Sequence, residues 1–347
     1  MEKKKLLIPG GSHGDIPLIL AAKRLGFHVT TTGNILEGYN GIGHNYSDEY
    51  FNIDYSDKEK MLNLSKKLKI DAICSGTNDF AAITSSFIAE KLDLPGHDDY
   101  QTTLKIHHKD KFRKFSLENN IPSPFAKSFD NTTEALKEFK KFKLPVIIKP
   151  IDLTGGKGVS KAGNQYEFEK AVKKAYSFSK AKKIVVEEFF EGSQHSFSLF
   201  LRNKNVVFHY GDNEYSHWNP YYVSTSSTPA LVPEWVQEKL INISEKIAKL
   251  LNLVDGIFHI QYLWNKNDKD FKIIEITRRS PGDLYFYPVK YSTGVNYPQW
   301  IVKAATGLDC SNFTFSSDKR TGYFGRHIVM SPEKGKIKSI VYDKSIR

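Results

Sequence analysis

Apolar and polar residues alternate in short blocks along the first hundred positions. Short β-branched or aliphatic runs predict strands, and runs with an apolar residue every three or four positions predict helices between them. The predicted strands are 6–9, 29–32, 50–54 and 72–75, and the predicted helices are 16–25, a helix capped by Ser56, and 79–92. Strands and helices that alternate with short links indicate a parallel, doubly wound sheet.

The pattern changes after Pro95-Gly96, where longer helices and antiparallel strands take over. Predicted helices cover 100–119, a segment capped by Thr132, 166–178 and 235–251; predicted strands cover 144–150, 184–187, a hairpin over 195–211, and the pair 256–264 and 271–277. This second part is α+β. The predicted fold class is therefore α/β, with an N-terminal doubly wound parallel-sheet domain followed by an α+β unit.

A glycine-rich turn, G-G-S-H-G at residues 10–14, follows the first strand and opens the first helix. A phosphate-binding turn occupies the same place in a wound sheet. The order is not G-x-G-x-x-G, however, and threonines rather than an acidic residue end the second strand. The sequence thus favours an ordinary turn over a dinucleotide site.

Charge and composition narrow the function classes. The chain of 347 residues carries 50 Lys+Arg against 39 Asp+Glu, a net charge of +11. The lysines lie between apolar residues on helical faces, which predicts solvated surfaces rather than a nucleic-acid site, although a basic cleft would attract a nucleotide. Two cysteines cannot form a disulfide framework, so we expect a reducing cytoplasm. No apolar run approaches the length of a membrane span.

Three segments within about forty residues carry candidate chemistry. Lys149 ends a predicted strand, a glycine-rich loop follows it, and the pair Glu187-Glu188 ends a later strand before Phe189. Glycines let backbone N–H groups approach phosphates, a lysine binds phosphate oxygens, and the glutamates could hold a ribose or an adenine edge. Downstream, Glu275 precedes two arginines, as in phosphoryl-transfer sites. Taken singly, each has an ordinary structural explanation, and it is their order that points to function.

That order resembles the ATP-grasp superfamily, in particular the branch that holds biotin carboxylase, carbamoyl-phosphate synthase large chains and purine-pathway ligases. The resemblance covers nearly the whole chain. The motifs that carry it are His108-Lys-Asp-Lys111 with Arg113 and Ile121-Pro-Ser-Pro124; Pro145-Val-Ile-Ile-Lys-Pro150; Thr154-Gly-Gly-Lys-Gly-Val159; Val185-Val-Glu-Glu-Phe-Phe-Glu-Gly192; and Ile273-Ile-Glu-Ile-Thr-Arg-Arg279 with Pro281-Gly-Asp283.

The resemblance implies ATP and Mg²⁺ (or Mn²⁺) as cofactors and assigns a role to each matching residue. Arg279 and Lys149 would be catalytic, and Arg279 would stabilise an acyl phosphate. Glu275, Gln261 and Thr277 would hold the metal. The implied nucleotide-binding residues are Lys111, Lys149, Gly155, Gly156, Gly158, Glu187, Glu188, Phe189 and His195.

Some positions depart from the superfamily's pattern. Gln194, Gln261 and Thr277 stand where carboxylates or an asparagine are usual. Neutral oxygens bind Mg²⁺ more weakly than carboxylates do, so either the site has less charge or a nearby acid, Asp283 or Glu188, contributes. The C-terminal subdomain also looks short.

The resemblance implies a ligase that joins a carboxylate to an amine or a thiol and releases ADP and phosphate. A bicarbonate-using carboxylase and a nucleotide-binding regulator with a degraded metal site stay open. The expected partners are small molecules, not nucleic acid or membrane, and a homodimer is left open. The expected domains are a pre-ATP-grasp domain over 1–105, a lid over 106–190 and a C-terminal subdomain over 191–347. The polar, aromatic segment 212–222 is either a surface loop or a wall of the acceptor pocket.

Overall fold

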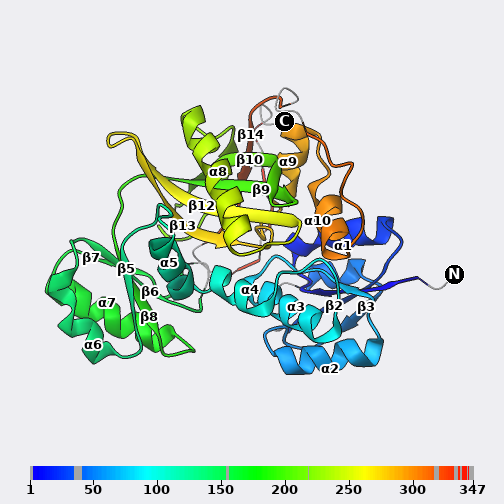
Figure 1. Cartoon of the computed structure of the whole chain (residues 1–347), viewed down its shortest axis with the longest axis horizontal. Coiled ribbons are helices and arrows are strands. Elements are labelled where there is room, and N and C mark those ends of the chain that lie inside the picture. Colours follow the sequence, from blue (N-terminus) through cyan, green and yellow to red (C-terminus); the bar gives the residue numbers. More distant parts are fainter. Residues whose placement is uncertain are drawn as a thin grey trace.

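Three sheets and the helices that cover them make up the computed structural model of the chain (Figure 1). The structure describes residues 3–34, 41–153, 156–217, 219–315, 320–331, 335–336, 338–341 and 343. No helix in these ranges is long and apolar enough to cross a bilayer.

The N-terminal sheet is parallel, with strand order β3-β2-β1-β4. Alternate residues of β1 pack on opposite faces: Leu6 and Ile8 contact α1, and Leu7 contacts α2 and α3. The predicted doubly wound domain is confirmed, and α3 has the predicted bounds. The elements are β1 (Lys5–Pro9), α1 (Ile16–Arg24), β2 (His28–Thr32), β3 (Glu49–Phe51), α2 (Lys58–Leu68), β4 (Ala72–Ile73) and α3 (Asp79–Leu92).

The single helix predicted over 100–119 is wrong: α4 (Tyr100–His107) and α5 (Lys109–Glu118) meet at His108, whose backbone is extended. The neighbouring His107 is fixed by a 2.8 Å contact between its Nδ1 and Oδ1 of Asp79. Helix α5 then packs Phe112 and Phe115 into the core of the large sheet.

A small antiparallel sheet with strand order β5-β8-β6-β7 forms the second layer. Helices α6 and α7 bury Ala135, Phe168 and Val172 against it, and this unit stands apart on the left of Figure 1. Its elements are β5 (Ala126–Phe129), α6 (Thr132–Lys137), β6 (Val146–Pro150), β7 (Ser160–Ala162), α7 (Gln165–Phe178) and β8 (Ile184–Glu188).

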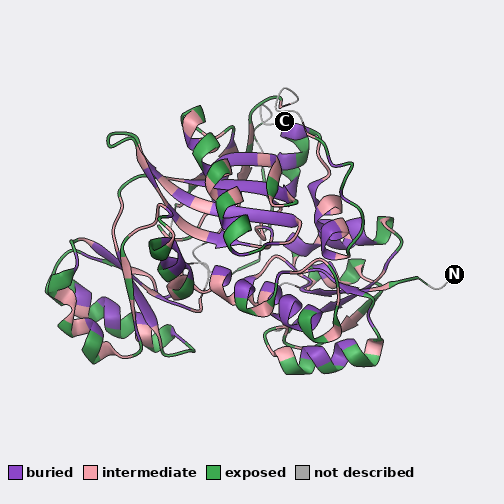
Figure 2. Cartoon of the chain, in the orientation of Figure 1, coloured by how far each residue is buried: buried purple, intermediate pink, exposed green. Residues whose placement is uncertain are grey.

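The large sheet is antiparallel, with strand order β13-β12-β9-β10-β11-β14. Helix α8 buries Val236, Leu240 and Ile247 against one face of the sheet. The central strands β9 and β12 are almost wholly buried (Figure 2). Its elements are β9 (Ser193–Arg202), β10 (Asn205–Tyr215), β11 (Thr225–Thr228), α8 (Glu234–Leu250), β12 (Gly256–Asn265), β13 (Asp270–Thr277), α9 (Phe286–Thr293), α10 (Tyr297–Ala305) and β14 (Phe324–His327).

The N-terminal domain and the large sheet share one core. Leu18 and Ala22 of α1 belong to the same buried cluster as Ile301 of α10 and Phe200 of β9. At the edge of the large sheet, β14 pairs with β11. No local pattern in the sequence predicts this last strand.

Candidate active site

A cleft of about 460 Å³ lies where the three sheets meet, and each sheet contributes to its walls. The N-terminal domain supplies Asp79, the small sheet supplies Lys149, and the large sheet supplies Glu275. Other polar side chains that line it are Lys109, Gln194, Glu214, His259, Gln261, Thr277, Arg279, Asp283 and Arg326.

The floor of the cleft is one face of the large sheet. Asp212, Ser196, Gln261 and Glu275 are register partners across β10, β9, β12 and β13. Partners in adjacent strands project to the same face, and so do residues two apart. Glu214 and Thr277 therefore extend the same polar surface.

The predicted metal ligands come together on this floor. Glu275 and Gln261 are register partners, and Thr277 is two residues beyond Glu275. Gln261 donates from Nε2 to both carboxylate oxygens of Glu214, at 3.1 and 2.9 Å. Thr277 donates from Oγ1 to the carbonyl of Arg279, at 3.1 Å. The amide oxygen of Gln261 and the two carboxylate oxygens of Glu275 are without hydrogen-bond partners among the described residues, so these three oxygens are free for a cation.

Lys149 is held in place by a buried carboxylate. Its Nζ lies 2.6 Å from Oε2 of Glu187, and Nε of Arg113 lies 3.0 Å from the other oxygen. Burial opposes ionisation of Glu187, but Arg113 and Lys149 outweigh it and bring the pKa of Glu187 down to about 2. Glu187 is only 2% exposed. Its carboxylate is thus taken up by cations rather than presented to an adenine.

The lysine that α5 places in the cleft is Lys109, which the sequence analysis did not select. Lys109 lines the cleft and donates from Nζ to the carbonyl of Leu153, at 2.9 Å. Lys111 is exposed and is not among the lining residues. Helix α5 begins at Lys109, directly after the extended backbone of His108.

Three further predicted nucleotide ligands lie outside the cleft lining. Glu188 accepts the backbone N–H of Lys143 at 3.0 Å, and the ring of Phe189 is covered by the ammonium of Lys161. His195 is 2% exposed and stacks on Tyr262, toward the α8 side of the sheet. Its neighbour Gln194 points into the cleft instead, because successive strand residues alternate between faces.

The glycine-rich loop after β6 lies against the other wall of the cleft. Gly156 and Gly158 both have positive φ, +70° and +73°. A Cβ on Gly156 would lie 2.7 Å from Cβ of Tyr221, and Tyr221 lines the cleft. Gly155 lies outside the described residues, so its role stays a prediction.

Arg279 faces the cleft and is oriented by the N-terminal domain. It makes a bidentate pair with Asp79, from Nε to Oδ1 at 3.1 Å and from Nη2 to Oδ2 at 2.9 Å. Burial would raise the pKa of Asp79, but Arg279 and His107 hold it well below its usual range. Asp79 is the first residue of α3 and was not selected from the sequence as a site residue.

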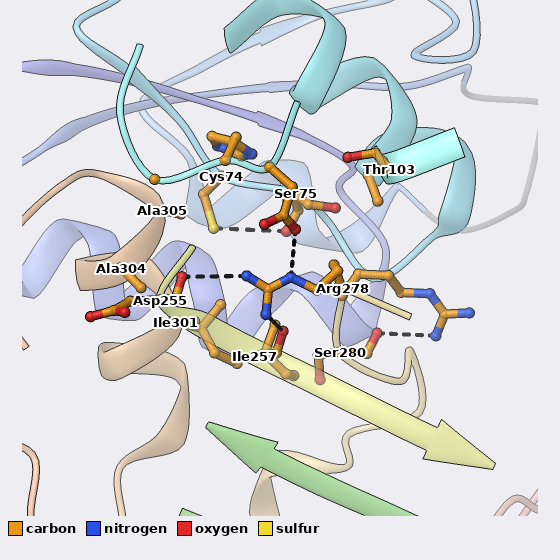
Figure 3. Close-up of a pocket in the computed structure, with 16 residues that line it drawn as sticks. Cys74, Ser75, Thr103, Asp255, Ile257, Arg278, Ser280, Ile301, Ala304 and Ala305 are labelled. Carbon is orange, nitrogen blue, oxygen red and sulfur yellow. Dashed lines mark hydrogen bonds and ion pairs between the residues drawn. The ribbon is translucent and has the colours of Figure 1, made fainter. Parts of the chain in front are cut away.

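The adjacent Arg278 has a different, structural role. Its guanidinium lies in a small internal cavity behind the cleft and bonds to Asp98 and to main-chain carbonyls (Figure 3). Nε donates to Oδ2 of Asp98 at 2.7 Å, and Nη2 donates to the carbonyl of Val254 at 2.7 Å. Only Arg279 of this pair lines the cleft.

Glu214 and Arg326, which the sequence did not identify, also line the cleft, and the buried Asp212 lies two residues before Glu214 on β10. Burial raises the pKa of Asp212 to about 7, and burial together with Asp212 raises that of Glu214 to about 8. Arg326 of β14 bonds to Asp283 at 2.5 Å, and its Nε has no hydrogen-bond partner among the described residues. Alternation along β10 could have pointed to Asp212 and Glu214, but nothing local marks Arg326.

Known proteins share this architecture. Residues 107–218 match the family described as phosphoribosylglycinamide synthetase, ATP-grasp (A) domain. The carbamoyl phosphate synthase large chain of Clostridium acetobutylicum is 21% identical over 307 residues, which cover 81% of this chain and 27% of that protein. The phosphoribosylamine–glycine ligase of Pyrococcus furiosus is 28% identical over 158 residues, 44% of this chain and 36% of that protein. The chain thus spans well under half the length of these two relatives.

Solved structures match almost the whole chain. An L-amino acid ligase from Bacillus licheniformis has a TM-score of 0.77 at 20% identity and covers 97% of this chain and 82% of its own. A phosphoribosylglycinamide synthetase from Anaerococcus prevotii has a TM-score of 0.76 at 22% identity, with 99% and 86% covered. Residues 107–218 therefore match an ATP-grasp domain, in agreement with the resemblance that the motifs predict.

We expect Glu187→Gln to lower the free energy of unfolding by about 3 kcal/mol, because it leaves two buried cations without a counter-charge. The folded pKa of Glu187, about 2, lies below its ordinary value of 4.5. Its stabilisation is therefore complete above pH 4.5 and is lost as the pH falls toward 2. Urea unfolding between pH 2.5 and 7 measures both effects. The neighbouring Glu188→Gln is the control; an equal loss in it would contradict the assignment.

Proposed function

We propose that this chain is an ATP-dependent ligase that joins a carboxylate to an amine through an acyl phosphate and releases ADP and phosphate. The observation that carries the proposal is the convergence in one cleft of Lys149 from the small sheet with Glu275 and Arg279 from the end of β13, where Asp79 of the N-terminal domain orients Arg279. Phosphoryl transfer depends chiefly on positioned positive charge, and this cleft supplies it on a rigid frame.

The residues present fit ATP and a divalent metal. Lys109, Lys149 and the glycine-rich loop would contact the phosphates, in accord with the cations and glycines that line the cleft. The free oxygens of Glu275 and Gln261, with Thr277 beside them, are the hard donors that Mg²⁺ prefers. A bound Mg²⁺ would neutralise charge on the phosphates.

The chain's own residues would orient the cations, bind the carboxylate and accept the proton of the amine. Asp79 holds Arg279 in a bidentate geometry, so that its guanidinium can stabilise negative charge on the acyl phosphate without reorganising. Glu187 likewise restrains Lys149. Arg326, which also lines the cleft, adds positive charge that would attract the carboxylate of the substrate. An attacking amine must lose a proton, and Glu214, which lines the cleft and whose pKa burial raises to about 8, is the group suited to accept it.

A screen for ADP release tests the proposal. The protein is supplied with Mg·ATP and with pairs of carboxylates and amines, with thiols and with bicarbonate in separate arms. We expect ADP only when a carboxylate is present, and more when an amine accompanies it. Release with bicarbonate alone would favour a carboxylase. ATP binding without ADP release in any arm would favour a regulator. The expected cytoplasmic location and the homodimer stay predictions.

Glu275→Gln should abolish turnover far more than it weakens nucleotide binding, because the metal acts chiefly on the transferring phosphoryl group. We expect ADP release to fall at least 1,000-fold while the affinity for metal-free ATP changes less than fivefold. Binding of Mn²⁺ in the presence of a non-hydrolysable ATP analogue, followed by electron paramagnetic resonance, should weaken at least tenfold. Asp268→Asn, an exposed acid in the turn before β13, is the control. Near-normal Mn²⁺ binding in Glu275→Gln would remove this residue from the metal site.

Gly156→Ala should weaken ATP binding about tenfold, because alanine disfavours φ of +70° and its Cβ would collide with Tyr221. Gly163→Ala is the matched control: Gly163 is also a glycine of the small-sheet unit, but a Cβ there would approach nothing closer than 3.6 Å. Calorimetry with ATP compares the two variants. Equal affinities would exclude a close fit of this loop over the phosphates.

A further inference from the structure

A second pocket, of about 570 Å³, lies at the carboxyl edge of the N-terminal sheet. Its walls follow each of the four parallel strands: Gly10 and His13 come after β1, Asn34 after β2, Asp54 after β3 and Thr77 after β4. The carboxyl ends of parallel strands form the crevice in which open α/β sheets bind ligands. The proposed ligase activity leaves this pocket unassigned.

The pocket is continuous with the cleft. His13, Thr77, Asn78 and Gly282 line both of them. The chain segments that line this shared boundary are packed closely, since a Cβ on Gly14 would lie 2.0 Å from the carbonyl oxygen of Gly282. A molecule seated on the N-terminal sheet can therefore extend one end toward Arg279 in the cleft.

The glycine turn in this pocket is closed to phosphate by a built-in anion. One carboxylate oxygen of Asp15 accepts the backbone N–H groups of Gly11 and Ser12 and the hydroxyl of Ser12, all at 2.8 Å. The other accepts the N–H and hydroxyl of Thr77, at 2.7 and 2.9 Å. Asp15 is 2% exposed. These are the donors that a phosphate would need, and a phosphate would also meet the charge of Asp15.

The space above the turn is occupied as well. A Cβ on Gly11 would lie 1.9 Å from the ring of His44, so the imidazole rests directly on this glycine. Nδ1 of His44 lies 2.9 Å from the hydroxyl of Thr31, while Nε2 is without a hydrogen-bond partner among the described residues. Burial lowers the pKa of His44, and a neutral ring offers no positive charge to a phosphate.

The remaining groups suit a polar molecule of low charge. Among the described lining residues Lys180 is the single Lys or Arg side chain, and it is exposed. It is balanced by the exposed carboxylate of Asp54, which accepts the N–H of Ser56 at 2.8 Å. His13, Asn34 and Tyr55 add groups that donate and accept hydrogen bonds.

Resting on the ligase activity proposed above, we propose that this pocket binds the amine substrate and that this amine carries no phosphate group. The class is an amino acid or an amino sugar, whose hydroxyl, carboxylate and ammonium groups match the lining. The carboxylate to be activated lies in the cleft, and the amine reaches it through the shared opening at Thr77 and Gly282.

Binding is measured by calorimetry, without turnover, in the presence of Mg²⁺ and a non-hydrolysable ATP analogue. The probes are the standard amino acids and common amino sugars, with serine against phosphoserine and glucosamine against glucosamine 6-phosphate as matched pairs. Two variants locate the site. Ser56→Trp places an indole at the exposed rim of the pocket, and Asn52→Trp places one at an exposed position that does not line it.

We expect at least one unphosphorylated amine to bind, its phosphorylated counterpart to bind at least tenfold more weakly, and Ser56→Trp to weaken it at least tenfold. Asn52→Trp should change nothing, and both variants should bind the ATP analogue as the parent does. The proposal is overturned if the phosphorylated member binds as well, if Ser56→Trp has no effect, or if no unphosphorylated amine binds. Binding is measured without ADP release. Failure of this proposal can therefore be distinguished from failure of the ligase assignment.

Discussion

The ion pair between Asp79 and Arg279 fixes the geometry of the cleft. It joins the first turn of α3 to the segment after β13, two residues 200 positions apart in the chain. Both side chains are nearly buried. Removing either one would leave the other as a charge that water solvates poorly. The candidate metal strand is thereby held at one distance from the N-terminal sheet. Arg278, the neighbouring residue, makes a second connection of this kind through its hydrogen bonds to Asp98 and to main-chain carbonyls.

The small sheet is tied to the same strand by similar means. Arg113 pairs with Glu187 through Nε and donates from Nη2 to the carbonyl of Ile274 at 2.7 Å. Glu187 in turn holds Lys149. Lys149 and Arg279, two of the cations in the cleft, are thus each restrained by a carboxylate from another segment. Such restraint keeps positive charge in place before a ligand arrives, which is the condition for electrostatic catalysis.

The sequence predicts the features that depend on residues close together in the chain, and it does not predict those that depend on contacts between distant residues. The alternation of the N-terminal strands and helices, the bounds of α3, and the pairing of Gln261 with Glu275 depend on local periodicity and on one hairpin, and they were predictable. The break at His108 lies beside His107, which contacts Asp79 of another helix, 28 residues away in the chain. Lys109, the first residue after that break, lines the cleft, whereas Lys111 does not. Arg326 lies on β14, the strand at the edge of the large sheet, and no local sequence pattern predicts its place in the cleft.

The two glycine-rich turns of the chain show why glycine alone does not identify a phosphate site. Both turns expose backbone and both adjoin a strand end. Around residues 10–14 the N–H groups are already taken by Asp15, which links the turn to Thr77 after β4. Around residues 156–158 the neighbours that line the cleft include Lys149 and Lys109. The charge that the surrounding fold brings to each turn, rather than the turn's own sequence, therefore determines whether it attracts an anion or excludes one.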